Sequence, residues 1–111
     1  IAMGVDRVLT SGQEASVMEG LPLLKKLVTQ AQGRIIVMPG AGISERNFAY
    51  VHEMVGASEY HVFVPAPVES KMQYRPGHIY MGGLLRQPEF DIFHTDEQRV
   101  NTFVEMGGTL Q

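Results

Sequence analysis

Short apolar runs alternate with amphipathic stretches along this chain, and glycine-containing turns separate them. Three runs have the composition of buried strands: Val5–Thr10, Arg34–Met38 and Glu59–Phe63. The first run leads into the turn Ser11-Gly12, and the second leads into the turn Pro39–Gly42. Strands that alternate with helical patterns predict parallel βα units around a buried sheet. Because the chemistry of such folds lies at the carboxyl ends of the strands, these turns are the expected place for a site.

Three stretches have apolar residues at helical spacing. We expect a short turn over residues 16–20 followed by a main helix from about Leu21 to Gln32, then helices over Ser44–Gly56 and Thr95–Gly108. Gly33, Gly56 and the pair Gly107-Gly108 are the expected helix ends. The expected N-caps are Ser16, Ser44 and Thr95, of which the first and last begin capping boxes. The expected buried faces are Leu21, Leu24, Leu27, Val28 and Ala31; Phe48, Val51 and Val55; and Val100, Phe103 and Val104.

A segment of roughly 30 residues, about 64–94, separates the third run from the last helix and is rich in proline and glycine. A structureless connection of this length is uncommon in a compact domain, so it is either a functional flap or a segment with short strands. Tyr74 and Ile79–Met81 are the candidates for brief strand pairing.

Composition narrows the class of protein. The chain has 111 residues, the size of one small domain, and a formal net charge of −3, which does not favour nucleic acid or an anionic membrane as a partner. No apolar run approaches the roughly 20 residues that cross a bilayer. The absence of cysteine excludes disulfides, zinc–thiolate sites and thiol catalysis within this sequence and fits a cytoplasmic location.

Four blocks of the sequence, taken together, resemble the CutC copper homeostasis family. They are Arg7–Gly12, Glu19–Pro22, Gly33–Ile43 and Glu59–His61, and the resemblance covers nearly the whole chain. It implies an α/β fold in which residues 1–111 form a partial TIM-barrel domain, the C-terminal three βα units of a (β/α)8 barrel. The first residue is not methionine. We therefore expect a piece of a longer protein that forms a homo-oligomer or associates with the missing barrel half.

The glycine turns are the first candidates for ligand binding. Gly40 and Gly42 would let backbone N–H groups approach an anion, or they serve only the backbone angles of a tight turn. In Thr10-Ser11-Gly12, the hydroxyls could orient a ligand, or Ser11 could cap the following turn. Both readings of each turn remain open at the level of sequence.

His61 is the expected metal residue. It lies two residues from Glu59, so both side chains point to the same face of a strand. Such a pair could be acid and base, a metal ligand with its orienting carboxylate, or a structural hydrogen-bonded pair. Met38 ends a strand and could face the barrel mouth, although methionine more often fills gaps in a core. His52, His78 and His94 are expected at the surface.

Three hypotheses about function follow. The resemblance implies a cytosolic copper homeostasis protein that binds or carries Cu(I), with copper as its ligand. The alternative from the residues is an enzyme of unknown reaction that binds a small anionic metabolite at the strand ends; no enzymatic reaction is implied by the resemblance. The third is an oligomerisation piece without a site. Because three strands leave sheet edges and apolar faces uncovered, the isolated piece is not expected to be a stable monomer.

Overall fold

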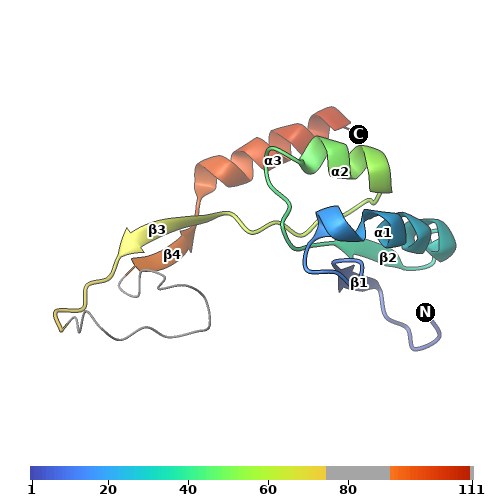
Figure 1. Ribbon diagram of the computed structural model, residues 1–111, viewed down its shortest axis with the longest axis horizontal. Coiled ribbons are helices and arrows are strands. Elements are labelled where there is room, and N and C mark those ends of the chain that lie inside the picture. Colours follow the sequence, from blue (N-terminus) through green and yellow to red (C-terminus); the bar gives the residue numbers. More distant parts are fainter. Residues whose placement is uncertain (75–90, 111) are drawn as a thin grey trace.

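The computed structural model describes residues 1–74 and 91–110 and is a mixed α/β structure (Figure 1). Its elements, in chain order, are β1 (Arg7–Thr10), α1 (Val17–Ala31), β2 (Ile36–Pro39), α2 (Phe48–Val55), β3 (Pro65–Glu69), β4 (Asp91–Thr95) and α3 (Glu97–Leu110).

The first half of the chain has the expected parallel arrangement. β1 pairs with β2 in parallel, with Arg7 opposite Ile36 and Thr10 opposite Pro39. Figure 1 shows α1 and α2 on the same side of this pair. Val37 is buried beneath the helices, whereas its neighbours Ile36 and Met38 are half-buried. The pair β1–β2 therefore has one face covered by helices and a second face, which we call the open face.

The third expected strand is absent from the structure, and this prediction was wrong. Residues Glu59–Phe63 form no regular strand, although the N–H of His61 donates a hydrogen bond to the carbonyl of Pro39 over 2.9 Å. The chain leaves β2 soon afterwards because the Val64 carbonyl accepts the N–H of Asp96 instead, and Pro65 has no N–H to donate. With one parallel pair among the described residues, the structure is too short to show a barrel, so the barrel remains a prediction.

The long segment contains short strands, one of its two expected forms. β3 and β4 pair antiparallel, from Pro65 opposite Thr95 to Glu69 opposite Asp91. The positions differ from those expected, because Tyr74 lies in no strand and Ile79–Met81 lie outside the described residues.

The first helix is longer than expected. α1 runs without a break from Val17 through Pro22, so there is no separate turn over residues 16–20. Ser16 precedes it but makes no side-chain cap hydrogen bond, and the capping-box prediction is wrong. Gly20 fits inside the helix because the loop after β1 packs against it. A Cβ at Gly20 would collide with the Ser11 carbonyl oxygen.

Ser16 is the N-cap residue of α1, as expected, whereas the other two helices begin after residues that were not expected as caps. Asn47 precedes α2, and its side-chain oxygen accepts the N–H of Ser44, so Ser44 opens a turn rather than capping the helix. The carboxylate of Asp96 accepts the N–H groups of Gln98 and Arg99 at the start of α3. Thr95 is instead the last residue of β4.

The predicted helix ends are partly right. Gly56 ends α2 in a left-handed conformation, as expected. α3 continues through Gly107 and Gly108 to Leu110, so the predicted stop is wrong. Glycine lowers helix stability without terminating a helix.

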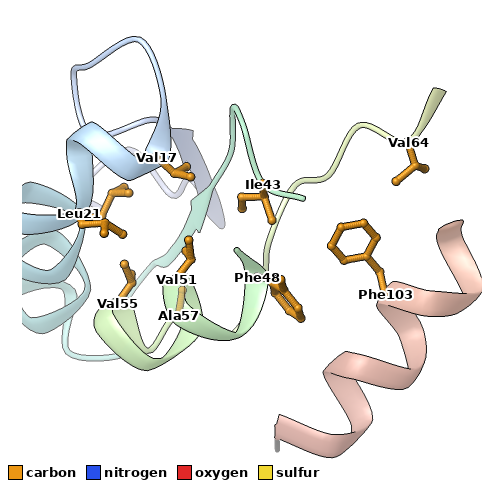
Figure 2. Close-up of a cluster of buried hydrophobic side chains, with 10 residues drawn as sticks. Val17, Leu21, Ile43, Phe48, Val51, Val55, Ala57, Val64 and Phe103 are labelled. Carbon is orange, nitrogen blue, oxygen red and sulfur yellow. The ribbon is translucent and has the colours of Figure 1, made fainter. Parts of the chain in front are cut away.

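The core lies between the helices and extends to α3 (Figure 2). Val17, Leu24 and Val51 are completely buried. Phe48 packs edge-on against Phe103 of α3, with ring centroids 5.6 Å apart. The expected core faces are largely confirmed, with Leu27, Val28 and Val100 half-buried. Val104 is the exception, because 68% of it is exposed.

Within the described part of the chain, none of the helices combines the length and apolar character needed to cross a bilayer.

Candidate functional site

A cavity of about 530 Å³ lies where β1 and β2 end. It is lined by Leu9–Ser11, Gly40–Ile43, His61 and Phe63. Three separate segments therefore meet at this cavity, and all of them come from the carboxyl ends or following turns of the expected strands.

Backbone hydrogen bonds hold these segments together. The N–H of Gly40 donates to the Thr10 carbonyl over 3.0 Å, which continues the β1–β2 pairing into the turn. The N–H of His61 donates to the Pro39 carbonyl, and the N–H of Val17 donates to the Ala41 carbonyl, each over 2.9 Å. The position of the His61 backbone is thus fixed by β2.

The two glycines of the second turn have different roles. A Cβ at Gly40 would lie 2.6 Å from Leu9 Cδ1 and 3.1 Å from His61 Cβ, so Gly40 leaves space for these side chains. Gly42 has a φ of 81°, a conformation that glycine adopts readily. Ala41 between them also has a positive φ, 88°, which is uncommon for a residue with a side chain.

The hydroxyls of the first turn are used locally. Thr10 Oγ1 accepts the N–H of Gly12 over 3.0 Å, and Ser11 Oγ donates to the Glu14 carbonyl over 2.6 Å. Gly12 is buried against Gly20 rather than lining the cavity. Thr10 and Ser11 do line the cavity, and a ligand role for these three residues remains a prediction.

Glu59 lies at the edge of the open face, where it forms an ion pair with Arg7. The guanidinium Nε is 2.9 Å from Glu59 Oε2, and Nη2 is 3.1 Å from Oε1. This hydrogen bond lowers the pKa of Glu59 and raises the pKa of Arg7. The carboxylate is therefore charged and bound to a cation, and a ligand role for Glu59 remains a prediction.

His61 is exposed and lines the cavity beside two apolar side chains, Leu9 and Phe63. Leu9 is 51% exposed and Phe63 is 72% exposed. Neither residue was a candidate from the sequence, although Phe63 follows Glu59 and His61 at the same two-residue spacing. This two-residue spacing could have indicated from the sequence that Phe63 lies on the same face as Glu59 and His61.

Of the remaining histidines, His52 is not at the surface as expected. It is half-buried on α2, and its Nδ1 is 2.8 Å from the hydroxyl of Tyr60. His94 is exposed on β4, and His78 lies outside the described residues.

The cavity offers backbone donors as well as one imidazole. The N–H groups of Ala41, Gly42 and Ile43 have no acceptor among the described residues. All three residues line the cavity. Residues 1–74 and 91–110 contain no group of three His, Cys, Asp or Glu side chains that could hold a metal ion. The residues that line the cavity thus carry an imidazole, a group that suits copper, and three N–H groups of the kind that bind small anions.

The family model and the curated relatives that match this chain all carry the name CutC. The model of the CutC family matches residues 1–65. A copper homeostasis protein cutC homolog of Homo sapiens is 43% identical over 102 residues, which are 92% of this chain and 37% of that protein. A family protein CutC of Parabacteroides distasonis is 40% identical over 104 residues, 94% of this chain and 43% of that protein. The chain spans about two-fifths of the length of these curated relatives.

Proposed function

This chain belongs to the CutC family, and from that membership we propose that it acts in copper homeostasis by binding Cu(I) at His61. Relatives from Homo sapiens and Mus musculus carry the name copper homeostasis protein cutC homolog, which supports the copper homeostasis role. In this proposal, copper is the ion that the protein binds or passes on in the cytosol.

The observation that carries this proposal is the position of His61. Its backbone is held by the Pro39 carbonyl, and its imidazole lines a cavity with Leu9 and Phe63. Imidazole is a suitable ligand for copper. Among the residues that line the cavity, His61 is the one that carries an imidazole for a copper ion.

A titration with Cu(I) under reducing conditions, against a competing chromogenic chelator, tests the proposal. We expect wild-type protein to bind Cu(I) with submicromolar affinity and His61→Ala to lose this binding. His94→Ala is the matched control, because His94 is exposed on β4, outside the cavity. Equal binding by wild type and His61→Ala would overturn the assignment to His61.

A second candidate is an enzyme of unknown reaction that binds a small anionic metabolite in the same cavity. The unbonded N–H groups of Ala41–Ile43 favour it, because backbone donors at a strand end recognise anions such as phosphate. Isothermal titration that detects binding of inorganic phosphate, together with the absence of Cu(I) binding, would favour this reading.

We also propose that the open face of β1–β2 is covered in the working protein, by a second copy or by the rest of the longer family chain. The support is the exposure of Leu9 and Phe63. The remaining hypothesis, a piece that oligomerises without any site, also needs a covered open face but binds neither Cu(I) nor phosphate.

Fractionation of cells that express a tagged chain tests the cytosolic location.

A further inference from the structure

The antiparallel ribbon of β3 and β4 projects away from the body of the molecule (Figure 1). Among the described residues, its two strands pair with each other and with no further strand. Ile92 and Phe93 of β4 are 48% and 50% exposed. A sheet of two strands is at best marginally stable in water, and an unpaired edge is a template for another strand. The backbone groups on the two outer edges therefore determine where the ribbon can accept a strand.

One hydrogen bond shows which backbone groups of the ribbon point outwards. The N–H of Asp96 donates to the Val64 carbonyl over 2.7 Å. Hydrogen-bonded and non-hydrogen-bonded pairs alternate along an antiparallel ladder, so the next pair, Pro65 and Thr95, is not hydrogen-bonded. The backbone groups of this pair point away from the ribbon, and those of every second pair along the ladder do the same.

The outer edge of β3 has few groups for a further strand. Pro65 and Pro67 occupy outward positions, and proline has no N–H to donate. The carbonyl of Pro65 already accepts a hydrogen bond from Arg99 Nη1 over 3.3 Å. Strand addition at β3 would therefore lack the donors that a ladder needs.

The outer edge of β4 is open. Its outward positions are Asp91, Phe93 and Thr95. Their N–H and carbonyl groups make no hydrogen bond with the described part of the chain. Asp91 is half-buried, and the other four residues of β4 are exposed. The ribbon therefore accepts a further strand through β4 rather than through β3.

We propose that β4 pairs antiparallel with β4 of a second copy of this chain, with the two Phe93 residues opposite each other. This register pairs all three outward positions, because Asp91 then lies opposite the partner's Thr95. Each of these pairs exchanges two backbone hydrogen bonds. A two-fold axis passes through the Phe93 pair, so the contact closes and two ribbons form one four-stranded sheet.

The side chains of β4 suit a second copy as the partner. The two Phe93 rings lie side by side on one face of the sheet, and aromatic pairs across strands stabilise a sheet. The two Asp91 carboxylates lie at opposite ends of the pairing, about 13 Å apart along the strands, so like charges do not face each other. Ile92 lies opposite the partner's His94. The sequence of β4 is thus complementary to itself in this register.

Engineered cysteines test the register, because the chain has no cysteine of its own. Ile92→Cys and His94→Cys are mixed in equal amounts and oxidised, and the disulfide-linked dimers are identified by mass spectrometry. In the proposed register, Ile92 and the partner's His94 form a non-hydrogen-bonded pair, in which the Cβ atoms are close enough for a disulfide. We expect the mixed dimer to predominate over both homodimers.

Val68→Cys, mixed with His94→Cys, is the matched control. Val68 is 46% exposed on the same ribbon, but it lies opposite Ile92 of its own chain. This mixture should form no excess of the mixed dimer. Homodimers as abundant as the mixed dimer in the first experiment, or an equal yield with Val68→Cys, would overturn the proposed pairing.

Phe93→Pro tests the backbone hydrogen bonds at the edge. The N–H of Phe93 points away from β3, so proline removes a donor to the second copy and leaves the ladder with β3 intact. Pro67, opposite Phe93, shows that an outward position of this ribbon admits proline. Introduced into both cysteine variants, Phe93→Pro should abolish the excess of the mixed dimer, whereas Phe93→Val, which keeps the N–H, should retain it. Cross-linking that survives Phe93→Pro would exclude pairing through this edge.

These tests are independent of the proposed function. The substituted residues lie on β3 and β4, outside both the open face and the cavity. Loss of Cu(I) binding or of association through the open face would therefore leave the ribbon pairing standing, and failure of the ribbon pairing would leave the copper proposal standing.

Discussion

Gly40 lines the cavity beside Leu9 and His61. A Cβ at this position would lie 2.6 Å from Leu9 Cδ1, which would have to move, and 3.1 Å from His61 Cβ, which would have to give by a few tenths of an ångström. Leu9 Cδ1 is the end of a flexible side chain and can move, so Gly40→Ala should fold. His61 Cβ is attached to a fixed backbone, so the imidazole must shift.

We therefore expect Gly40→Ala to weaken Cu(I) binding by about tenfold or more, measured by chelator competition. Gly107→Ala is the matched control, because a Cβ there meets nothing within 4 Å. Unchanged affinity in Gly40→Ala would show that the space beside His61 does not matter for the metal.

Tyr60 joins α2 to the segment that carries His61. Its hydroxyl accepts the N–H of Ala57 over 3.1 Å and is 2.8 Å from His52 Nδ1. Burial raises the pKa of Tyr60, which favours the protonated phenol. Tyr60→Phe should lower the free energy of unfolding by about 1–3 kcal/mol, because it leaves the Ala57 N–H without its partner. Urea denaturation measures this, and the half-exposed Tyr50→Phe should change little; equal losses in both variants would contradict the account.

At the scale of elements, the parallel pair and the three helices follow from local signals in the sequence. Glycine at a strand end and apolar residues at helical spacing identify β1, β2 and α2 to within a few residues. The failures depend on contacts between distant segments. Glu59–Phe63 has strand composition, but the hydrogen bond from Asp96 to Val64 diverts the chain after it. No local pattern specifies that bond.

The candidate site was partly predictable, because some of its residues are marked by local signals and others depend on contacts between distant segments. Thr10, Gly40 and His61 converge because each lies near the end of an expected strand or follows one. The pairing of Glu59 with Arg7 was not foreseen, because it joins residues 52 positions apart. The apolar walls of the cavity, at Leu9 and Phe63, depend on which side of the sheet the helices cover.

The glycine pair within α3 lowers the stability of this helix. A Cβ added at Gly107 or Gly108 would meet open space, and neither residue has a positive φ. Gly107→Ala should raise the free energy of unfolding by up to about 1 kcal/mol, because alanine loses less backbone entropy on forming a helix. Thermal unfolding followed by circular dichroism measures the change. A lower midpoint would mean that α3 does not extend through these residues.

An ion pair connects α3 to the turn before α2. Arg99 Nε is 2.8 Å from Glu45 Oε1, and this hydrogen bond lowers the pKa of Glu45. A carboxyl group with a lowered folded-state pKa stabilises the fold above its unfolded pKa, about 4.3, and loses this contribution as pH falls through the folded value. Glu45→Gln should therefore unfold at a lower temperature than wild type at pH 7. The difference should diminish below about pH 4; a constant difference across this range would exclude the ion pair as its source.

The whole molecule is extended for its length. Its radius of gyration is 17.5 Å, whereas a compact domain of this size has about 13 Å. Figure 1 shows that the ribbon β3–β4 projects away from the body that α1, α2 and the parallel strands form. Within the described residues, β1 pairs with β2 alone, so its outer edge is unpaired. An unpaired edge and an open apolar face favour association.

We therefore expect the chain to self-associate through the open face in sedimentation velocity at micromolar concentration. Phe63→Ser should shift the distribution towards monomer, because it removes an apolar ring that is 72% exposed on that face. Val104→Ser is the matched control, since Val104 is 68% exposed but lies on α3. If both variants reduced association equally, self-association would depend on exposed apolar side chains in general and not on the open face in particular. A wild-type chain that sediments as a folded monomer would show that this face is stable in water, and the need for a covering partner would be withdrawn.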